Sequence, residues 1–123
     1  KEYLLDGGTG NKSVVEQTLE IMSRMRLDPK SDYTFDRDGT VLCLWLNHIY
    51  DLYTKYRKDY AILGETLTYA QFKKQLQHSD YYISSNEPKR IGGELRKVWM
   101  LNYELLKERC DLSGFEITGV EPL

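Results

Sequence analysis

The chain has 123 residues, of which 41% are hydrophobic and 29% are charged, and its formal net charge is −2. This composition suits one soluble domain that buries a core without disulfides. It argues against a membrane protein, because no apolar run approaches the roughly 18 residues of a membrane span, and two cysteines are too few for a disulfide framework.

Residues 1–12 are predicted to form a flexible lead-in, because Gly7, Gly8 and Gly10 fall within four positions. The string GGTGNK lacks the spacing of a phosphate-binding loop, so a solvated linker is the better interpretation. The first residue is Lys1 and not Met, which leads us to expect a domain excised from a longer protein, or a processed chain.

An N-terminal helix is predicted to begin at Ser13, within a segment of residues 13–40 that also holds a connecting hairpin or loop. The string Ser13-Val-Val-Glu16 matches a capping box, in which the hydroxyl and the carboxylate satisfy free backbone amides. The helix is expected to stop before Asp28-Pro29, because a residue that precedes proline leaves the helical region. Its apolar positions follow helical spacing: Val15, Leu19, Met22 and Met25/Arg26.

A long amphipathic helix is predicted from about Leu42 to Tyr60. Before it, Asp36–Gly39 forms a turn signal between two short β-prone runs, which make either a small hairpin or a loop. The helix is favoured because its apolar side chains recur at steps of three and four residues and share one stripe. These side chains are Leu42, Leu46, Ile49, Tyr53, Tyr56 and Tyr60.

A shorter helix is predicted over Tyr69–His78. Thr68-Tyr-Ala-Gln71 is a second capping box, and Ser79-Asp80 ends the helix. Its apolar face holds Tyr69, Phe72 and Leu76, while the outer face shows Gln71, Lys74, Gln75 and His78, with Lys73 and Gln77 at the margins.

A β-hairpin is predicted next, from the runs Tyr81–Ser85 and Leu95–Met100. Between them lies a turn-rich segment with one proline and the pair Gly92-Gly93. Four basic residues are expected at or near the tip of this hairpin: Lys89, Arg90, Arg96 and Lys97.

A last short helix, Tyr103–Cys110, is predicted with Asn102 as its cap. It is followed by a C-terminal tail, residues 113–123, which is loosely structured or forms a short strand over Phe115–Thr118. The helices and the hairpin between residues 41 and 112 form the predicted core of the domain.

The order of these elements is that of a winged-helix domain, an α+β and mainly helical fold in which a hairpin, the wing, lies beside a recognition helix. The positive charge follows the same elements, because residues 54–97 carry nine Lys/Arg against five Asp/Glu. A short helix fits the major groove of DNA, and basic residues at a wing tip gain from counterion release at phosphates. The predicted nucleic-acid-binding residues are Gln71, Lys73, Lys74, Gln75 and His78 on the helix, and Lys89, Arg90, Arg96 and Lys97 on the wing.

Three stretches, LNHIYDLYTKYRKDY, LTYAQFKKQL and KRIGGELRKVWML, carry a resemblance to a known family. Together they resemble the C-terminal winged-helix region of primase-helicases from phages and mobile elements, the poxvirus-type superfamily-three group. The resemblance covers roughly residues 42–106. It implies a DNA-binding module of a replication protein whose ATPase motifs, absent from this chain, belong to a longer parent.

Two other functions stay open. The acidic flanks and ten tyrosines fit a winged-helix-like adaptor that binds other replication proteins or neighbouring protomers, because tyrosine suits interfaces. A transcriptional regulator of the same fold would bind as a symmetric dimer, and residues 13–26 are the candidate dimerisation helix. DNA, double- or single-stranded, is the partner that the leading hypothesis predicts.

The sequence gives little support to an enzyme. No HExxH or CxxC motif and no Ser/His/Asp spacing occurs, so we expect no catalytic residue, no cofactor and no metal. His48 is expected to be structural, and Cys43 and Cys110 are expected to be buried free thiols. Trp45 and Trp99 are expected to lie in the core, with stacking on a base as the alternative for Trp99 on a wing strand. Free thiols are typical of an intracellular, cytoplasmic protein, and no membrane partner is expected.

Overall fold

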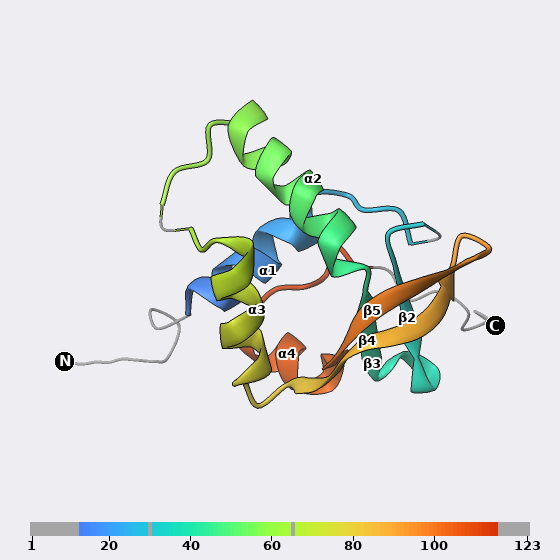
Figure 1. The fold of residues 1–123 in the computed structure, drawn as a ribbon. Coiled ribbons are helices and arrows are strands. Elements are labelled where there is room, and N and C mark those ends of the chain that lie inside the picture. Colours follow the sequence, from blue (N-terminus) through green and yellow to red (C-terminus); the bar gives the residue numbers. More distant parts are fainter. Residues whose placement is uncertain (1–12, 30, 65, 116–123) are drawn as a thin grey trace.

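The computed structural model describes residues 13–29, 31–64 and 66–115. Within these residues the chain forms an α+β fold of four α-helices and one four-stranded antiparallel sheet (Figure 1). The elements in chain order are α1 (Val14–Arg24), β2 (Tyr33–Asp36), the short 3-10 helix η2 (Arg37–Gly39), β3 (Val41–Leu44), α2 (Leu46–Asp59), α3 (Tyr69–Gln77), β4 (Tyr82–Ile91), β5 (Glu94–Asn102) and α4 (Tyr103–Arg109).

The sheet has the strand order β2-β3-β5-β4, with every neighbouring pair antiparallel. Strand β5 therefore lies between β3, which comes before the two central helices, and β4, which comes after them. The pairing is regular from Glu87 to the turn, but the register shifts between Tyr82 and Glu87. Asn86 in this bulge has a positive φ of 59°, a conformation that asparagine adopts more readily than most residues.

The helices cover one face of the sheet, and the largest core lies between them (Figure 1). Side chains alternate along β5, so that Trp99 and Leu101 belong to this helix-side core, whereas Val98 and Met100 belong to a second, smaller cluster on the other face. We call these the helix face and the far face of the sheet. The smaller cluster contains Val41, Cys43, Ile91, Val98 and Met100, with Trp45 packed against it.

Both predicted capping boxes are present. The Ser13 hydroxyl accepts from the amide of Glu16 at 3.1 Å, and the Thr68 hydroxyl accepts from that of Gln71 at the same distance. Helix α1 ends at Arg24, earlier than the predicted stop before Asp28-Pro29. The chain leaves the helix at Arg26, whose φ is +59°.

The predicted start of the long helix at Leu42 is wrong. Residues Val41–Leu44 form β3, which pairs with both β2 and β5, and α2 begins only at Leu46. All four residues of β3 are buried, because the strand lies inside the sheet and is covered on both faces. Such a strand reads as a continuous apolar run, which periodicity cannot distinguish from a buried helix. Around Asp36–Gly39 the sequence is compatible with either a small hairpin or a loop, and the pairing of β2 with β3 shows that it is a hairpin.

The β4–β5 hairpin, predicted to be a wing, is longer than expected from the sequence. Strand β4 continues through Pro88 to Ile91, so only Gly92 and Gly93 remain in the turn, with φ of 63° and 84°. Two adjacent residues of positive φ match the tight turn that fits the twist of a hairpin. Lys89 and Arg90 are therefore strand residues and do not form the tip. Proline is tolerated here because its missing N–H does no harm at the edge of the sheet.

Helix α4 agrees with its prediction, since the Asn102 side chain accepts from the amide of Leu105 at 3.1 Å. The predicted lead-in of residues 1–12 lies outside the described residues, as does most of the predicted strand Phe115–Thr118. Across the described ranges, no helix has the length and apolar character needed to cross a membrane.

Candidate nucleic-acid interface

Helix α3 is held against the sheet by its two fully buried side chains, Phe72 and Leu76. Tyr50 of α2 packs against this helix, with its ring centroid 5.6 Å from that of Phe72 and 5.0 Å from that of Tyr69. The Tyr50 hydroxyl donates to the carbonyl of Leu67, which fixes the segment leading into α3. These contacts determine which side of α3 faces away from the core.

The predicted outer face of α3 is exposed as expected, with Gln71, Lys74, Gln75 and His78 in solvent. Two of these side chains already serve their own helix. The side-chain Oε1 of Gln71 accepts from the backbone amide of Thr68 at 3.0 Å. Nδ1 of His78 lies 2.8 Å from the backbone carbonyl oxygen of Lys74. The side chains of Lys74 and Gln75 remain available on this face.

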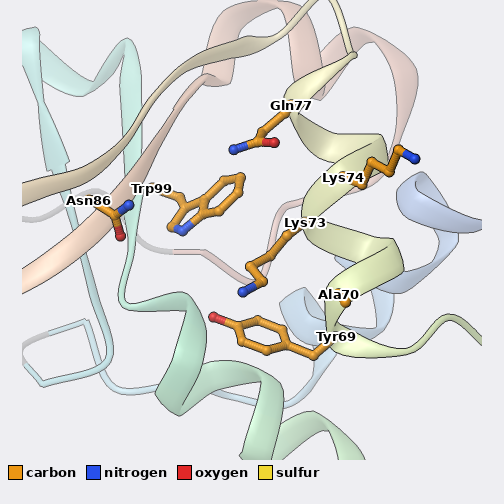
Figure 2. Close-up of a pocket in the computed structure, with 7 residues that line it drawn as sticks. All are labelled: Tyr69, Ala70, Lys73, Lys74, Gln77, Asn86 and Trp99. Carbon is orange, nitrogen blue, oxygen red and sulfur yellow. The ribbon is translucent and has the colours of Figure 1, made fainter.

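A pocket of about 390 Å³ lies between α3 and the β4–β5 hairpin (Figure 2). Lys73 points into it and lies 4.3 Å from the centroid of the Tyr69 ring, while the Lys74 side chain extends away from it in this view. The pocket is lined by Tyr69, Ala70, Lys73, Lys74, Gln77, Asn86 and Trp99.

The sheet register divides the four predicted wing residues into two pairs. Lys97 is opposite Pro88 and Arg90 is opposite Leu95, positions that alternate onto the helix face with Trp99. Lys89 is opposite Arg96, and this pair alternates onto the far face with Val98. The structure therefore brings Arg90 and Lys97 to the side of the sheet that carries α3, and places Lys89 and Arg96 on the opposite side.

Lys89, on the far face of the sheet, forms an ion pair within the fold. Its Nζ lies 2.5 Å from Oδ2 of Asp36 in β2. The hydrogen bond from Lys89 holds the pKa of Asp36 below its usual value, and the same bond raises the pKa of Lys89. The pair joins the β4–β5 hairpin to the β2–β3 hairpin, which is a structural role.

Arg96 is the end of a stack on the same face. Its guanidinium carbon lies 4.1 Å from the Trp45 ring centroid, and the Trp45 ring stacks on that of His48 at 4.3 Å. His48 in turn has its Nε2 2.8 Å from Oδ1 of Asp32. A second contact joins Arg96 to Glu94 at 3.2 Å. Arg96 and the half-buried His48 are thus engaged inside the fold.

Sequence reasoning missed Asn86, Gln77 and Tyr69 as members of a site. The sequence places Gln77 at the margin and Tyr69 on the apolar face of a helix. Neither position predicts that the side chain lines a pocket. Asn86 gives a usable signal only in hindsight, because asparagine at a strand irregularity tolerates positive φ. The bulge that places Asn86 in the pocket wall depends on register, which the sequence of one strand does not define.

The described residues contain no group of three or more His, Cys, Asp or Glu side chains placed to hold a metal ion. Cys43 and Cys110 are buried free cysteines. Burial raises the pKa of the Cys43 thiol to about 11, which makes it a poor nucleophile near neutral pH. Comparisons with protein-family models, with curated proteins and with solved structures found no match for this chain.

Proposed function

We propose that this chain is a winged-helix nucleic-acid-binding module, with α3 as the recognition helix and β4–β5 as the wing. The observation that carries the proposal is the register of β4–β5, which presents Arg90 and Lys97 on the face that also carries Lys73 and Lys74 of α3. A helix and a hairpin with cations on one side form a surface that can follow a phosphate backbone.

The topology supports the same proposal. In a winged helix a first helix and a first strand precede two helices and a hairpin, and the third strand lies between the other two. Here the chain order is α1, β2, β3, α2, α3, β4, β5, and β5 lies between β3 and β4. Strand β2 is an addition to the winged-helix pattern and pairs with β3 at the other edge of the sheet. The α2–α3 connection, from Tyr60 to Thr68, is longer than the three- or four-residue turn of a helix-turn-helix. The proposal is therefore for a winged helix with an extended connection.

The role of each group follows from its chemistry. Lys74 of α3 and Lys97 of β5 would contact phosphates, which orient the protein on the nucleic acid but carry little sequence information. Gln75 would reach base edges, since glutamine bonds adenine in the major groove. Lys89 and Arg96 are left out of this surface because they are engaged on the far face. The proposed activity is binding without catalysis, as part of a phage or mobile-element replication protein of the primase-helicase or initiator type.

The test is fluorescence anisotropy of labelled double- and single-stranded DNA at 50 and 200 mM salt. We expect binding that weakens steeply with salt, because phosphate contacts release counterions. The double variants Lys73→Glu/Lys74→Glu and Arg90→Glu/Lys97→Glu should each lower affinity by at least about tenfold, through loss of two cationic contacts and the introduction of repulsion.

The matched control is Lys55→Glu/Lys58→Glu, which makes the same change of charge at two exposed positions of α2. It should lower affinity by less than about threefold, because these lysines lie outside the proposed surface. If the α2 variant weakens binding as much as the α3 and wing variants, attraction depends on overall charge and the assigned surface is wrong. If the wild type does not bind at 50 mM salt, the function itself is wrong.

A second candidate, a protein-binding adaptor, is favoured by one observation. Tyr60 and Leu63, at the end of α2 and in the connection that follows, are 68% and 90% exposed. The two side chains lie three residues apart in the chain, and neighbouring exposed apolar side chains that form one patch are typical of a contact with another protein. An interface of this kind would be insensitive to salt, so the same salt series separates the two functions.

A further inference from the structure

The pocket between α3 and the wing has the size of a ligand site. Its volume of about 390 Å³ lies in the range of roughly 300–1,000 Å³ that small-molecule sites occupy. Its walls come from three elements, with Tyr69, Lys73 and Gln77 on α3, Asn86 on β4 and Trp99 on β5 (Figure 2). Because these residues are far apart in the sequence, the pocket depends on the packing of α3 against the hairpin.

The lining combines three kinds of group. Aromatic surface comes from Tyr69 and from the small open part of the Trp99 ring, since Trp99 is 6% exposed. Gln77 and Asn86 offer amides that both donate and accept, and Lys73 offers one ammonium group. In Figure 2 the Gln77 and Asn86 side chains lie on either side of the Trp99 indole, and Lys73 lies between Trp99 and Tyr69. Within the part of the chain that the structure describes, the Gln77 and Asn86 side chains make no hydrogen bond and no acidic side chain lines the pocket, so both amides are available to a ligand.

We propose that this pocket accepts one unpaired nucleobase from a single-stranded or locally opened nucleic acid. Aromatic surface with amide groups is the chemistry that recognises an unstacked base, through contact with its ring and hydrogen bonds to its edges. The ammonium group of Lys73 would donate to a carbonyl oxygen on the edge of the base. This inference rests on the proposed function and names the form of nucleic acid that the surface selects.

A base fits this lining better than a free anion does. An anion site gathers several cations or backbone N–H donors around one point. Figure 2 shows one ammonium group, that of Lys73, pointing into this pocket, and the Gln77 and Asn86 amides bring acceptor oxygens as well as donors. The strand that enters would keep its backbone outside, where Lys74 extends away from the pocket and Lys97 lies on the same face of the sheet. The arrangement therefore separates a place for the base from a path for the phosphates.

The experiment uses Trp99 as its own reporter. The full chain carrying Trp45→Phe has Trp99 as its single tryptophan, and its emission is measured during titration with a twelve-residue oligo-dT. The matched ligand is an oligonucleotide of equal length built from abasic sites, which keeps the phosphates and lacks the bases. We expect oligo-dT to change the emission with saturation and the abasic strand to leave it unchanged. An oligo-U arm shows whether ribose is also accepted.

Two substitutions test the amides. Asn86→Gly removes the side chain at a position whose positive φ glycine adopts freely, and Gln77→Met removes the amide but keeps the length of the chain. Each should weaken oligo-dT binding about three- to tenfold and leave the affinity for a blunt duplex within about twofold. Asn47→Ala is the control, because it removes an exposed amide from α2 that lies outside both the pocket and the proposed binding surface.

The outcomes separate this inference from the function on which it rests. Duplex binding together with an unchanged Trp99 signal on adding oligo-dT would overturn the pocket and leave the nucleic-acid function standing. Equal responses to oligo-dT, the abasic strand and inorganic phosphate would show an anion site and would also overturn it. Failure of the duplex and of every single strand to bind would overturn both.

Discussion

The contact between Lys89 and Asp36 gives Lys89 a structural role, although the sequence predicts that this lysine binds nucleic acid. Lysine at a hairpin suggests a phosphate contact, but the register turns Lys89 to the far face of the sheet, where a carboxylate lies 2.5 Å away. Both side chains are about one-third exposed. Solvent therefore screens the pair, and its contribution to stability is expected to stay below about 1 kcal/mol.

We expect Lys89→Met to lower the free energy of unfolding by less than about 1 kcal/mol at pH 7. The pKa of Asp36 is lowered in the folded state, so its contribution is present above the unfolded value of about 3.9 and is lost as the pH falls through the folded value. The pKa of Lys89 is raised, so the contribution is also lost in strong alkali. Urea denaturation at pH 7 and at pH 2.5 checks the difference.

Lys97→Met is the matched control for this pair, because it removes a lysine from the same hairpin on the other face. It should leave stability unchanged within about 0.5 kcal/mol at either pH. If Lys89→Met destabilises the protein equally at pH 7 and pH 2.5, the lysine acts through the packing of its aliphatic chain and the ion pair contributes nothing.

Gly114, in the chain after α4, packs tightly against Ser23 of α1. A Cβ atom there would lie 1.8 Å from the backbone oxygen of Ser23, and the Gly114 amide donates to the Ser23 hydroxyl at 2.8 Å. We expect Gly114→Ala to lower the free energy of unfolding by about 1–3 kcal/mol, because backbone must move to relieve the overlap. Thermal or urea denaturation measures it, and Ser113→Ala, at the exposed neighbour, should be nearly neutral.

At the scale of the element, the end of α2 carries a conformation that its sequence does not favour. The amide of Ile62 donates to the Arg57 carbonyl at 3.0 Å and that of Ala61 to the Lys58 carbonyl at 3.4 Å, the pattern of a Schellman motif. The residue that turns the chain, Ala61, has a φ of +50°. Glycine usually holds this position, because a Cβ is strained there.

Ala61→Gly is therefore expected to stabilise the protein by up to about 1 kcal/mol, although glycine normally destabilises helical segments. Ala70→Gly is the comparison variant and should have the opposite effect. Ala70 lies within α3, so glycine there should lower the free energy of unfolding by about 0.5–1 kcal/mol. Chemical denaturation of both variants checks the pair. A loss of stability in Ala61→Gly would show that the αL turn is not strained in this chain.

The elements also show what could be read from the sequence and why. Both capping boxes, the helix α3 with its buried Phe72 and Leu76, and the cap at Asn102 depend on neighbours three or four residues away, and all were predictable. Strand β3 was not, because its partners β2 and β5 lie on either side of it in space and bury both of its faces.

For the molecule as a whole, the register of the β4–β5 pairing decides which basic residues belong to the candidate surface. The sequence places four basic residues on one hairpin, and it cannot say which pair shares a face with α3, because a shift of one residue in register exchanges the faces. The pocket at Trp99 was beyond prediction for the same reason, since it requires the bulge at Asn86 and the packing of α3 together. Trp99 itself was correctly expected to be largely buried.

The bulge and the proline of β4 have a further consequence, for the behaviour of the protein in concentrated solution. In the described sheet β4 has a partner only on its β5 side, and a straight strand in that position offers a template on which other chains can add. Pro88 removes one donor from that edge, and the register shifts near Asn86 break its regular spacing. The irregularity that shapes the pocket thus also protects the wing from edge-to-edge aggregation.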